Sequence, residues 1–168
     1  TLDDDLDVDN HRWLSVVVPS ATRVLCVEGT HQAAEFVVLA LDPNANGGTR
    51  VAPTVVASDA LLETNLQDYH CVMLCDVGRV EQEELKLLSR FVRDGGGLVT
   101  VLGPRVDIEN YNALLGGEDA SGRLLPARLQ GLAGDTLQHF DPLDYRHPIV
   151  VAFAGHERSG LLTAPTWR

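Results

Sequence analysis

The chain has 168 residues, which is enough for one domain of moderate size with a buried core. Hydrophobic residues make up 45% of it and charged residues 22%, the balance of a soluble globular protein. Its formal net charge of -11 argues against nucleic acid as a partner, because phosphate binding requires clustered Lys and Arg. The sequence has no apolar run of about 18 residues and no signal peptide, so we expect no membrane insertion by this segment.

The first 22 residues differ in character from the rest of the chain. The first ten contain five Asp and no basic side chain. The chain also begins without Met, so we expect it to be a piece of a longer protein. We interpret residues 1–22 as the tail or linker of a preceding β-domain, and residues 23–168 as one α/β domain.

From residue 23 onward, apolar runs alternate with helical patterns. Strands are predicted where apolar runs are bounded by Gly, Asp, Asn or Pro, at residues 23–27, 51–57, 71–75 and 98–102. Pro53 places the second of these at an edge of the sheet. A helix is predicted over residues 32–41, with Ala34, Val37, Val38 and Leu41 on its inner face. Residues 61–66 form a short helical or irregular link.

The best-formed pattern of the chain is the segment 80–105. Its apolar residues recur at helical spacing and fall on one stripe, formed by Leu85, Leu88, Phe91 and Val92. Glutamates occupy the first turn of this helix and arginines the last, as the helix dipole favours. Three glycines at 95–97 then supply a left-handed helix end and a tight turn. The apolar run at 98–102 predicts a buried strand, covered on both faces.

This alternation predicts the fold class: a three-layer, flavodoxin-like α/β fold with a mainly parallel sheet and helices on both faces. The pattern is looser after Arg105. A short helix is expected over residues 109–117, and residues 124–132 read as a loop or an inserted strand. Residues 141–148 are rich in turn formers, and residues 149–153 predict a last apolar strand.

The three cysteines, Cys26, Cys71 and Cys75, lie inside predicted strands. A free Cys in such a place behaves as a small hydrophobe. Cys71 and Cys75 share one strand face, but their α-carbons would be about 13 Å apart, too far for a disulfide. We expect three inert core thiols.

Polar residues and a glycine follow the ends of the predicted strands. Ligands of open α/β sheets bind beyond the carboxyl ends of the strands, so these residues form a candidate ligand rim. We name the set the strand-end rim: Glu28, His31, Asp76, Arg79, Gly103 and Arg105. The alternative is that these side chains cap helices and solvate loops.

Known catalytic and metal-binding motifs are missing from the sequence. There is no GxSxG motif, and the six histidines are scattered without HExxH or Cys–His spacing. The glycines at 95–97 precede a strand instead of following one, so their amides lie at the wrong end of the sheet for a phosphate loop. We therefore predict no metal and no cofactor.

Several segments, taken in order, resemble the class I glutamine amidotransferase-like superfamily. More narrowly, the chain is similar to the amidotransferase-like domain of large, membrane-anchored bacterial proteins with a von Willebrand factor A domain, common in planctomycetes. The matching segments are Asp9, Asn10 and Arg12, RVLCVEG at 23–29, FVRDGGGLVTVLG at 91–103, YNALL at 111–115, LLPARL at 124–129 and HPIVVAF at 147–153. They span nearly the whole chain.

The resemblance also indicates what this chain lacks. The family's catalytic Cys would fall on Leu102, whose aliphatic side chain excludes thiolate attack. The His-x-Glu pair of the family is also missing, since His156 and Glu157 are adjacent. The resemblance therefore implies a non-catalytic binding or scaffolding domain.

The implied partners are other proteins or neighbouring domains of the parent chain. The resemblance leaves open whether the domain faces the cytoplasm or the periplasm. One alternative is a hydrolase or transferase that uses Glu28, His31 and Asp76, which predicts that these side chains converge with Arg105 in one pocket. Another is an architectural spacer, which predicts a uniformly polar surface, whereas a binding domain predicts an exposed apolar or charged patch.

Overall fold

The computed structural model describes residues 14–15, 20–44, 50–117, 123–131, 143–151 and 153–155. The chain divides into two compact units, Thr1–Arg128 and Leu129–Arg168. Most of the predicted tail, with the Asp9, Asn10 and Arg12 segment, lies outside the described residues.

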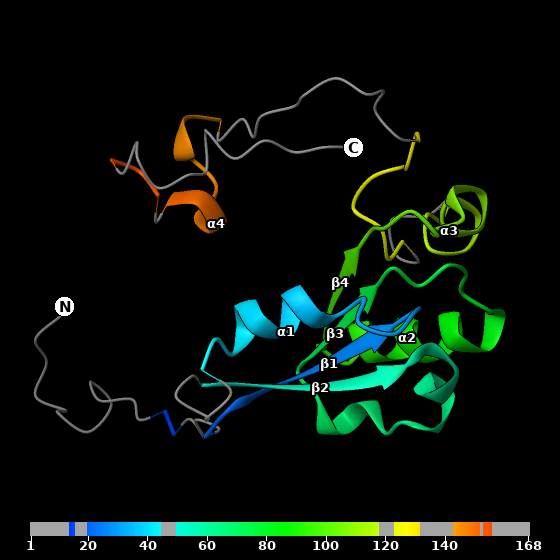
Figure 1. Ribbon diagram of the computed structural model, residues 1–168, viewed down its shortest axis with the longest axis horizontal. Helices are drawn as coiled ribbons and strands as arrows, with labels where there is room; N and C mark the ends of the chain where they lie inside the picture. The colour runs from blue at the N-terminus through cyan, green and yellow to red at the C-terminus, as the bar shows by residue number, and fades with distance from the viewer. Residues whose placement is uncertain are drawn as a thin grey trace, which may run out of the picture. The chain divides into compact units, whose positions relative to one another are not determined.

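The first unit is built on a four-stranded, fully parallel sheet (Figure 1). Its strands are β1 (Thr22–Glu28), β2 (Val51–Ala57), β3 (Cys71–Cys75) and β4 (Gly97–Val101), in the order β2-β1-β3-β4. All four lie within one or two residues of their predicted positions. The two central strands, β1 and β3, are the most buried, and β2, which carries Pro53, is an edge strand as predicted.

One face of the sheet is covered by α1 (Glu35–Leu41), which Figure 1 shows in front of the strands. The core on this side includes alternate residues of the central strands, such as Cys26 and Cys75, together with Ala34. The predicted inner residues of the helix pack against this cluster. The helix begins later than predicted, because Gln32 has a left-handed backbone (φ 68) that a helix does not accept.

The other face is covered by α2 (Gln82–Arg93), which lies behind the sheet in Figure 1. Its Leu88 and Phe91 are buried, as the stripe of apolar residues predicts. At its start, the Glu81 N–H donates to Glu84 Oε2 at 2.7 Å. At its end, Gly95 is left-handed (φ 100). The predicted three-layer, flavodoxin-like α/β architecture is therefore confirmed.

The turn after α2 is a Schellman motif, which satisfies the last carbonyls of the helix. The Gly95 N–H donates to Val92 O at 3.1 Å, and the Gly96 N–H donates to Phe91 O at 2.9 Å. A Cβ at Gly96 would lie 2.3 Å from Cζ of the Phe91 ring. The glycine run is therefore a turn that also lets the backbone pack on a core aromatic ring.

Short helical segments complete the first unit. Two 3-10 helices, η1 (Ser58–Glu63) and η2 (Leu66–Asp68), form the predicted link between β2 and β3. The predicted short helix after β4 is α3 (Ile108–Leu114). Residues 124–131 contain no strand, so of the two expected alternatives, a loop or an inserted strand, the structure has the loop.

The prediction that the strand at 98–102 is covered on both faces is wrong. β4 is the last strand of the described sheet, and Val99 is 41% exposed. Its apolar sequence indicated burial, but α1 covers mainly the centre of its face of the sheet. Leu102, just beyond the strand, is also exposed.

In the second unit, the predicted strand at 149–153 is also wrong. Residues Pro148–Val151 form the short helix α4, which follows the 3-10 turn η3 (Leu143–Tyr145). The N–H groups of Val150 and Val151 both donate to His147 O at 3.0 Å. Proline is favoured at the first helical position, and a short apolar run does not by itself distinguish helix from strand. Within the described part of the chain, no helix combines the length and apolar character that crossing a bilayer requires.

Candidate functional site

The strand order creates a switch point between β1 and β3. The chain leaves β1 toward β2 on one side of the sheet and leaves β3 toward β4 on the other. In open parallel sheets, ligands bind at the carboxyl ends of the strands at such a point. Because Glu28 pairs in register with Cys75, the switch point lies between Glu28 and Asp76.

Asp76 is the central residue of the rim. Its backbone is left-handed (φ 48), a conformation that Asp and Asn adopt more readily than most residues. Asp76 Oδ1 accepts a hydrogen bond from the backbone N–H of Arg105 at 3.0 Å. A Cβ at Gly103 would lie 2.4 Å from this oxygen, so Gly103 makes room for the carboxylate. The structure thus brings three of the six rim residues together.

The carboxyl ends of β1 and β3 are also in close contact. The Gly29 N–H donates to Cys75 O at 2.9 Å. A Cβ at Gly29 would lie only 2.0 Å from the backbone oxygen of Asp76. Only glycine fits here without moving the two strands apart, which explains the Glu-Gly end of β1.

Glu28 and His31 form a second, separate pair. The distance from Glu28 Oε1 to His31 Nδ1 is 3.9 Å, too long for a hydrogen bond. The side chain of His31 is 90% exposed, whereas that of Glu28 is 16% exposed. The pair is therefore weak, and the imidazole is solvated.

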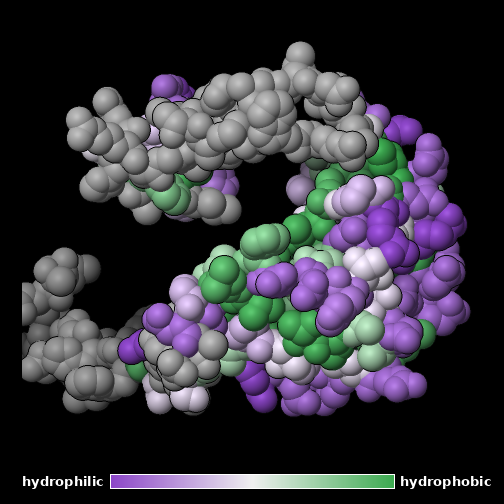
Figure 2. Space-filling model, in the orientation of Figure 1, coloured by the Kyte–Doolittle hydropathy of each residue, from purple (hydrophilic) through white to green (hydrophobic). Residues whose placement is uncertain are grey.

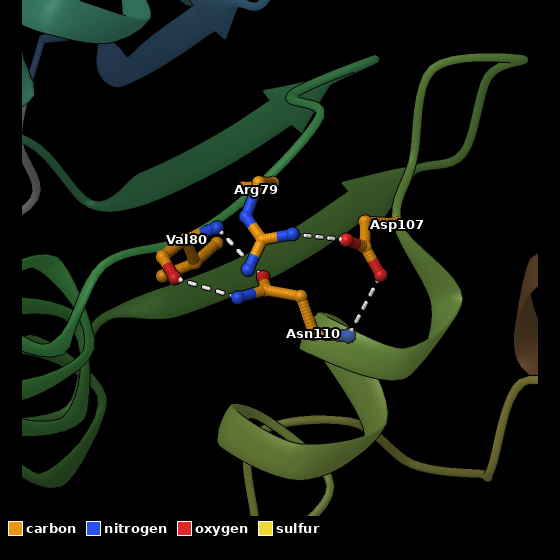
Figure 3. Close-up of polar contacts among 4 residues, drawn as sticks. All are labelled: Arg79, Val80, Asp107 and Asn110. Atoms are coloured by element: carbon orange, nitrogen blue, oxygen red, sulfur yellow. Dashed lines mark hydrogen bonds and ion pairs between the residues drawn. The ribbon is translucent and has the colours of Figure 1, made fainter.

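Arg79 is directed to α3 (Figure 3). Its guanidinium pairs with Asp107, the residue that begins α3. Asp107 Oδ1 in turn accepts from the backbone N–H of Asn110 at 2.9 Å, a normal helix cap. Arg79 therefore belongs to a connection between two loops and not to a group around Asp76.

The same connection uses the side chain of Asn110 (Figure 3). Its Oδ1 accepts from the Val80 N–H at 2.9 Å and its Nδ2 donates to Val80 O at 3.1 Å. The two residues are thirty positions apart, so no local sequence pattern indicates the contact. It fixes the start of α3 against the loop that leads into α2.

Sequence reasoning missed Tyr111 as a residue of this region. It is 1% exposed, and its hydroxyl donates to Val77 O at 2.7 Å. Burial raises the pKa of the Tyr111 hydroxyl, and the negative charges of Asp76 and Glu84 raise it further. The available signal was its spacing of four from Leu115, which places both residues on one buried helix face.

The cysteines are free thiols, as expected. Cys26 and Cys75 are buried and Cys71 is half-buried. Burial raises the pKa of the Cys26 thiol from 9.0 to about 11, with further contributions from Cys75 and Cys71. Burial likewise raises the pKa values of the other two thiols. A thiol that stays protonated at neutral pH is a poor nucleophile, so these residues serve the core.

Most of the rim side chains have contacts within the fold. Asp76 and Arg79 are engaged in contacts that join loops, and Glu28 forms a long, weak pair with the exposed imidazole of His31. Arg105 contributes its backbone N–H to this arrangement. Among the described residues, no three His, Cys, Asp or Glu side chains are grouped so as to hold a metal ion.

No family model, curated protein or solved structure matches this chain.

Proposed function

We propose that this chain is a non-catalytic, amidotransferase-like domain that binds or scaffolds other proteins within a larger, membrane-anchored bacterial protein. The resemblance of segments such as 23–29 and 91–103 supports this family, and the parallel α/β sheet agrees with it. The observation that carries the proposal is the side chain of Leu102. It follows β4 and is 50% exposed, at the place where the family has a nucleophilic Cys.

An aliphatic side chain in this position has no ionisable group and forms no acyl intermediate. The nearby thiols do not replace it, because Cys75 is buried inside β3 and its pKa is raised by burial. Asp76, the carboxylate at the switch point, accepts the hydrogen bond of a backbone N–H. These three observations support binding over amidotransferase chemistry.

An exposed apolar surface supports a protein partner. We call it the apolar surface and define it as Phe36, Leu39, Val55 and Val99. Phe36 is 81% exposed, and the other three are also exposed. In Figure 2, hydrophobic side chains gather over α1 and extend toward β4.

The register explains how this surface arises. Val55 of β2 pairs with Cys26, Cys26 pairs with Met73, and Met73 pairs with Val99. The four side chains therefore lie in one row on the face that carries α1. The helix buries Cys26 in the centre and leaves the two edge valines exposed. Exposed apolar groups of this kind are typical of protein-binding sites, and the net charge of -11 disfavours nucleic acid.

Site-directed photo-crosslinking in the intact parent protein tests this proposal. A benzophenone amino acid at Phe36 or Val99 is expected to crosslink to a neighbouring domain or a partner protein. The matched control is the same amino acid at Lys86, an exposed position on α2, the opposite layer. Equal crosslinking from all three positions would contradict a binding role for the apolar surface.

A glutaminase assay tests the non-catalytic part of the proposal. The chain is expected to release no ammonia from glutamine above the background rate. If the unsubstituted chain does hydrolyse glutamine and Glu28→Gln does not, the result would instead support the enzyme alternative at the strand-end rim.

A further inference from the structure

A pocket of about 520 Å³ lies at the opposite end of the sheet from the strand-end rim. It opens at the amino-terminal ends of β3 and β4, between the η2 segment and the last turns of α2. The side chains that matter for its chemistry are Tyr69, His70, Leu87, Arg90 and Asp94. A pocket of this size suits a small molecule, since such sites are typically about 300–1,000 Å³.

The walls of the pocket are held in place by hydrogen bonds within the fold. On one side, Asn65 Oδ1 accepts from the Gln67 N–H at 3.3 Å, and Asn65 Nδ2 donates to Asp68 Oδ2 at 3.1 Å. On the other side, the Schellman turn packs Gly96 against the Phe91 ring. Between them, the Gly97 N–H donates to His70 O at 2.9 Å. The pocket is therefore largely preformed.

The floor of the pocket is apolar and aromatic. Leu66 and Phe91 are almost fully covered, with 4% and 8% of their surfaces exposed, whereas Tyr69 and Leu87 also line the pocket and are only half-buried. Aromatic rings such as that of Tyr69 favour another ring, through edge-to-face or offset contacts. The floor thus suits the flat apolar part of a ligand.

The mouth of the pocket carries one positive and one negative side chain. Arg90 Nε lies 3.7 Å from Asp94 Oδ2, and these side chains are 74% and 65% exposed. An exposed ion pair at this distance is weak, so both groups can be recruited by a ligand at little cost. Nearby, His70 Nδ1 accepts from the Arg23 N–H at 3.0 Å, so the proton of the neutral ring lies on Nε2. His70 Nε2 is therefore a further donor.

We propose that this pocket binds a free α-amino acid with an aromatic side chain. In an α-amino acid, the carboxylate and the ammonium group are attached to the same carbon, so the two charges match a close Arg–Asp pair. The carboxylate binds Arg90 and His70 Nε2–H, and the ammonium group binds Asp94. The aromatic ring lies against Tyr69 and Leu87. A peptide terminus carries only one of the two charges and matches the mouth less well.

The test is a titration of the full 168-residue chain with L-phenylalanine, followed by amide NMR shifts. Saturable shifts are expected at the amides of His70, Gly95 and Gly96. Phenylacetate lacks the ammonium group and phenethylamine lacks the carboxylate, so each is expected to bind at least about fivefold more weakly. Equal binding of either analogue, or shifts without saturation, would overturn the proposal.

Two variants and a matched control complete the test. Arg90→Gln and Asp94→Asn change exposed side chains, so both proteins are expected to fold and to bind L-phenylalanine at least about fivefold more weakly. Arg93→Gln removes the same charge from the same helix turn, at a side chain that donates to Ser89 O, and is expected to leave affinity unchanged. An equal loss in Arg90→Gln and Arg93→Gln would show a general charge effect and refute the site. Because no residue of the apolar surface is involved, this result is independent of the proposed function.

Discussion

The role of Asp76 provides the sharpest test of how the strand-end rim works. If the carboxylate serves the fold, Asp76→Ala removes two contributions at once. It removes the acceptor for the Arg105 N–H, and it places Ala at a left-handed φ of 48. Asp76→Asn keeps a side-chain oxygen as acceptor, and Asn also tolerates this left-handed backbone conformation. The two variants therefore separate a structural role from one that needs the negative charge.

The magnitude follows from these two contributions. A hydrogen bond to a charged acceptor contributes about 1.5–3 kcal/mol, and the lower end applies because this one is exposed. The left-handed backbone costs Ala about 1 kcal/mol. We expect Asp76→Ala to lower the free energy of unfolding by about 2–3 kcal/mol and Asp76→Asn by less than about 1 kcal/mol.

Urea denaturation followed by circular dichroism measures both effects. With a denaturant slope of about 2 kcal/mol/M, Asp76→Ala shifts the midpoint down by about 1 M. The control is Asp59→Ala, which changes an exposed aspartate of η1. Its free energy of unfolding is expected to stay within about 0.5 kcal/mol of that of the unsubstituted chain. If Asp76→Asn is as destabilised as Asp76→Ala, or if Asp76→Ala is hardly destabilised, the structural reasoning is refuted.

Three further predictions concern buried groups near the rim and in the core. Tyr111→Phe leaves Val77 O without its partner and is expected to lower stability by about 1–2 kcal/mol. Because the folded pKa of Tyr111 is raised above 10.0, its stabilisation is complete below pH 10 and is lost at higher pH. The unsubstituted chain should therefore lose more stability above pH 10 than Tyr111→Phe. Parallel curves of unfolding free energy against pH for the two proteins would contradict this. Asn110→Ala removes both hydrogen bonds to Val80 and is expected to cost about 1–2 kcal/mol and to speed amide exchange at Val80; unchanged exchange would argue against the contact. Cys26, with a pKa of about 11, is expected to react with iodoacetamide at pH 8 far more slowly in the folded chain than in urea, and equal rates would rule out its burial.

Local patterns in the sequence were sufficient to predict the four strands and α2 of the first unit. The four strands and α2 carry periodic apolar residues and end at Gly, Asp or Pro, which act over a few residues. Pro53 indicated an edge strand because it lacks the N–H that a central strand needs. The alternation of strands and helices was then enough for a parallel three-layer fold.

Where local signals compete, the sequence was less informative. Residues 149–153 are apolar and three of the five are β-branched, yet Pro148 begins a helix there. The helix α1 starts late because the backbone of Gln32 turns left-handed, which no pattern of apolar residues encodes. The exposure of Val99 likewise depends on which parts of the sheet α1 covers.

The sequence alone placed the rim residues at the strand ends and identified Leu102 in the position of the family's nucleophile. Only the tertiary structure joined Asp76 to the Arg105 N–H, left His31 exposed, directed Arg79 toward Asp107, and buried Tyr111 against Val77. The contacts of Asp76, Arg79 and Tyr111 join residues about thirty positions apart, so they depend on strand order and on the packing of α3. The pocket beside Phe91 depends equally on two segments meeting in space. Local periodicity determines which elements form, whereas the distances between their side chains arise only when those elements pack.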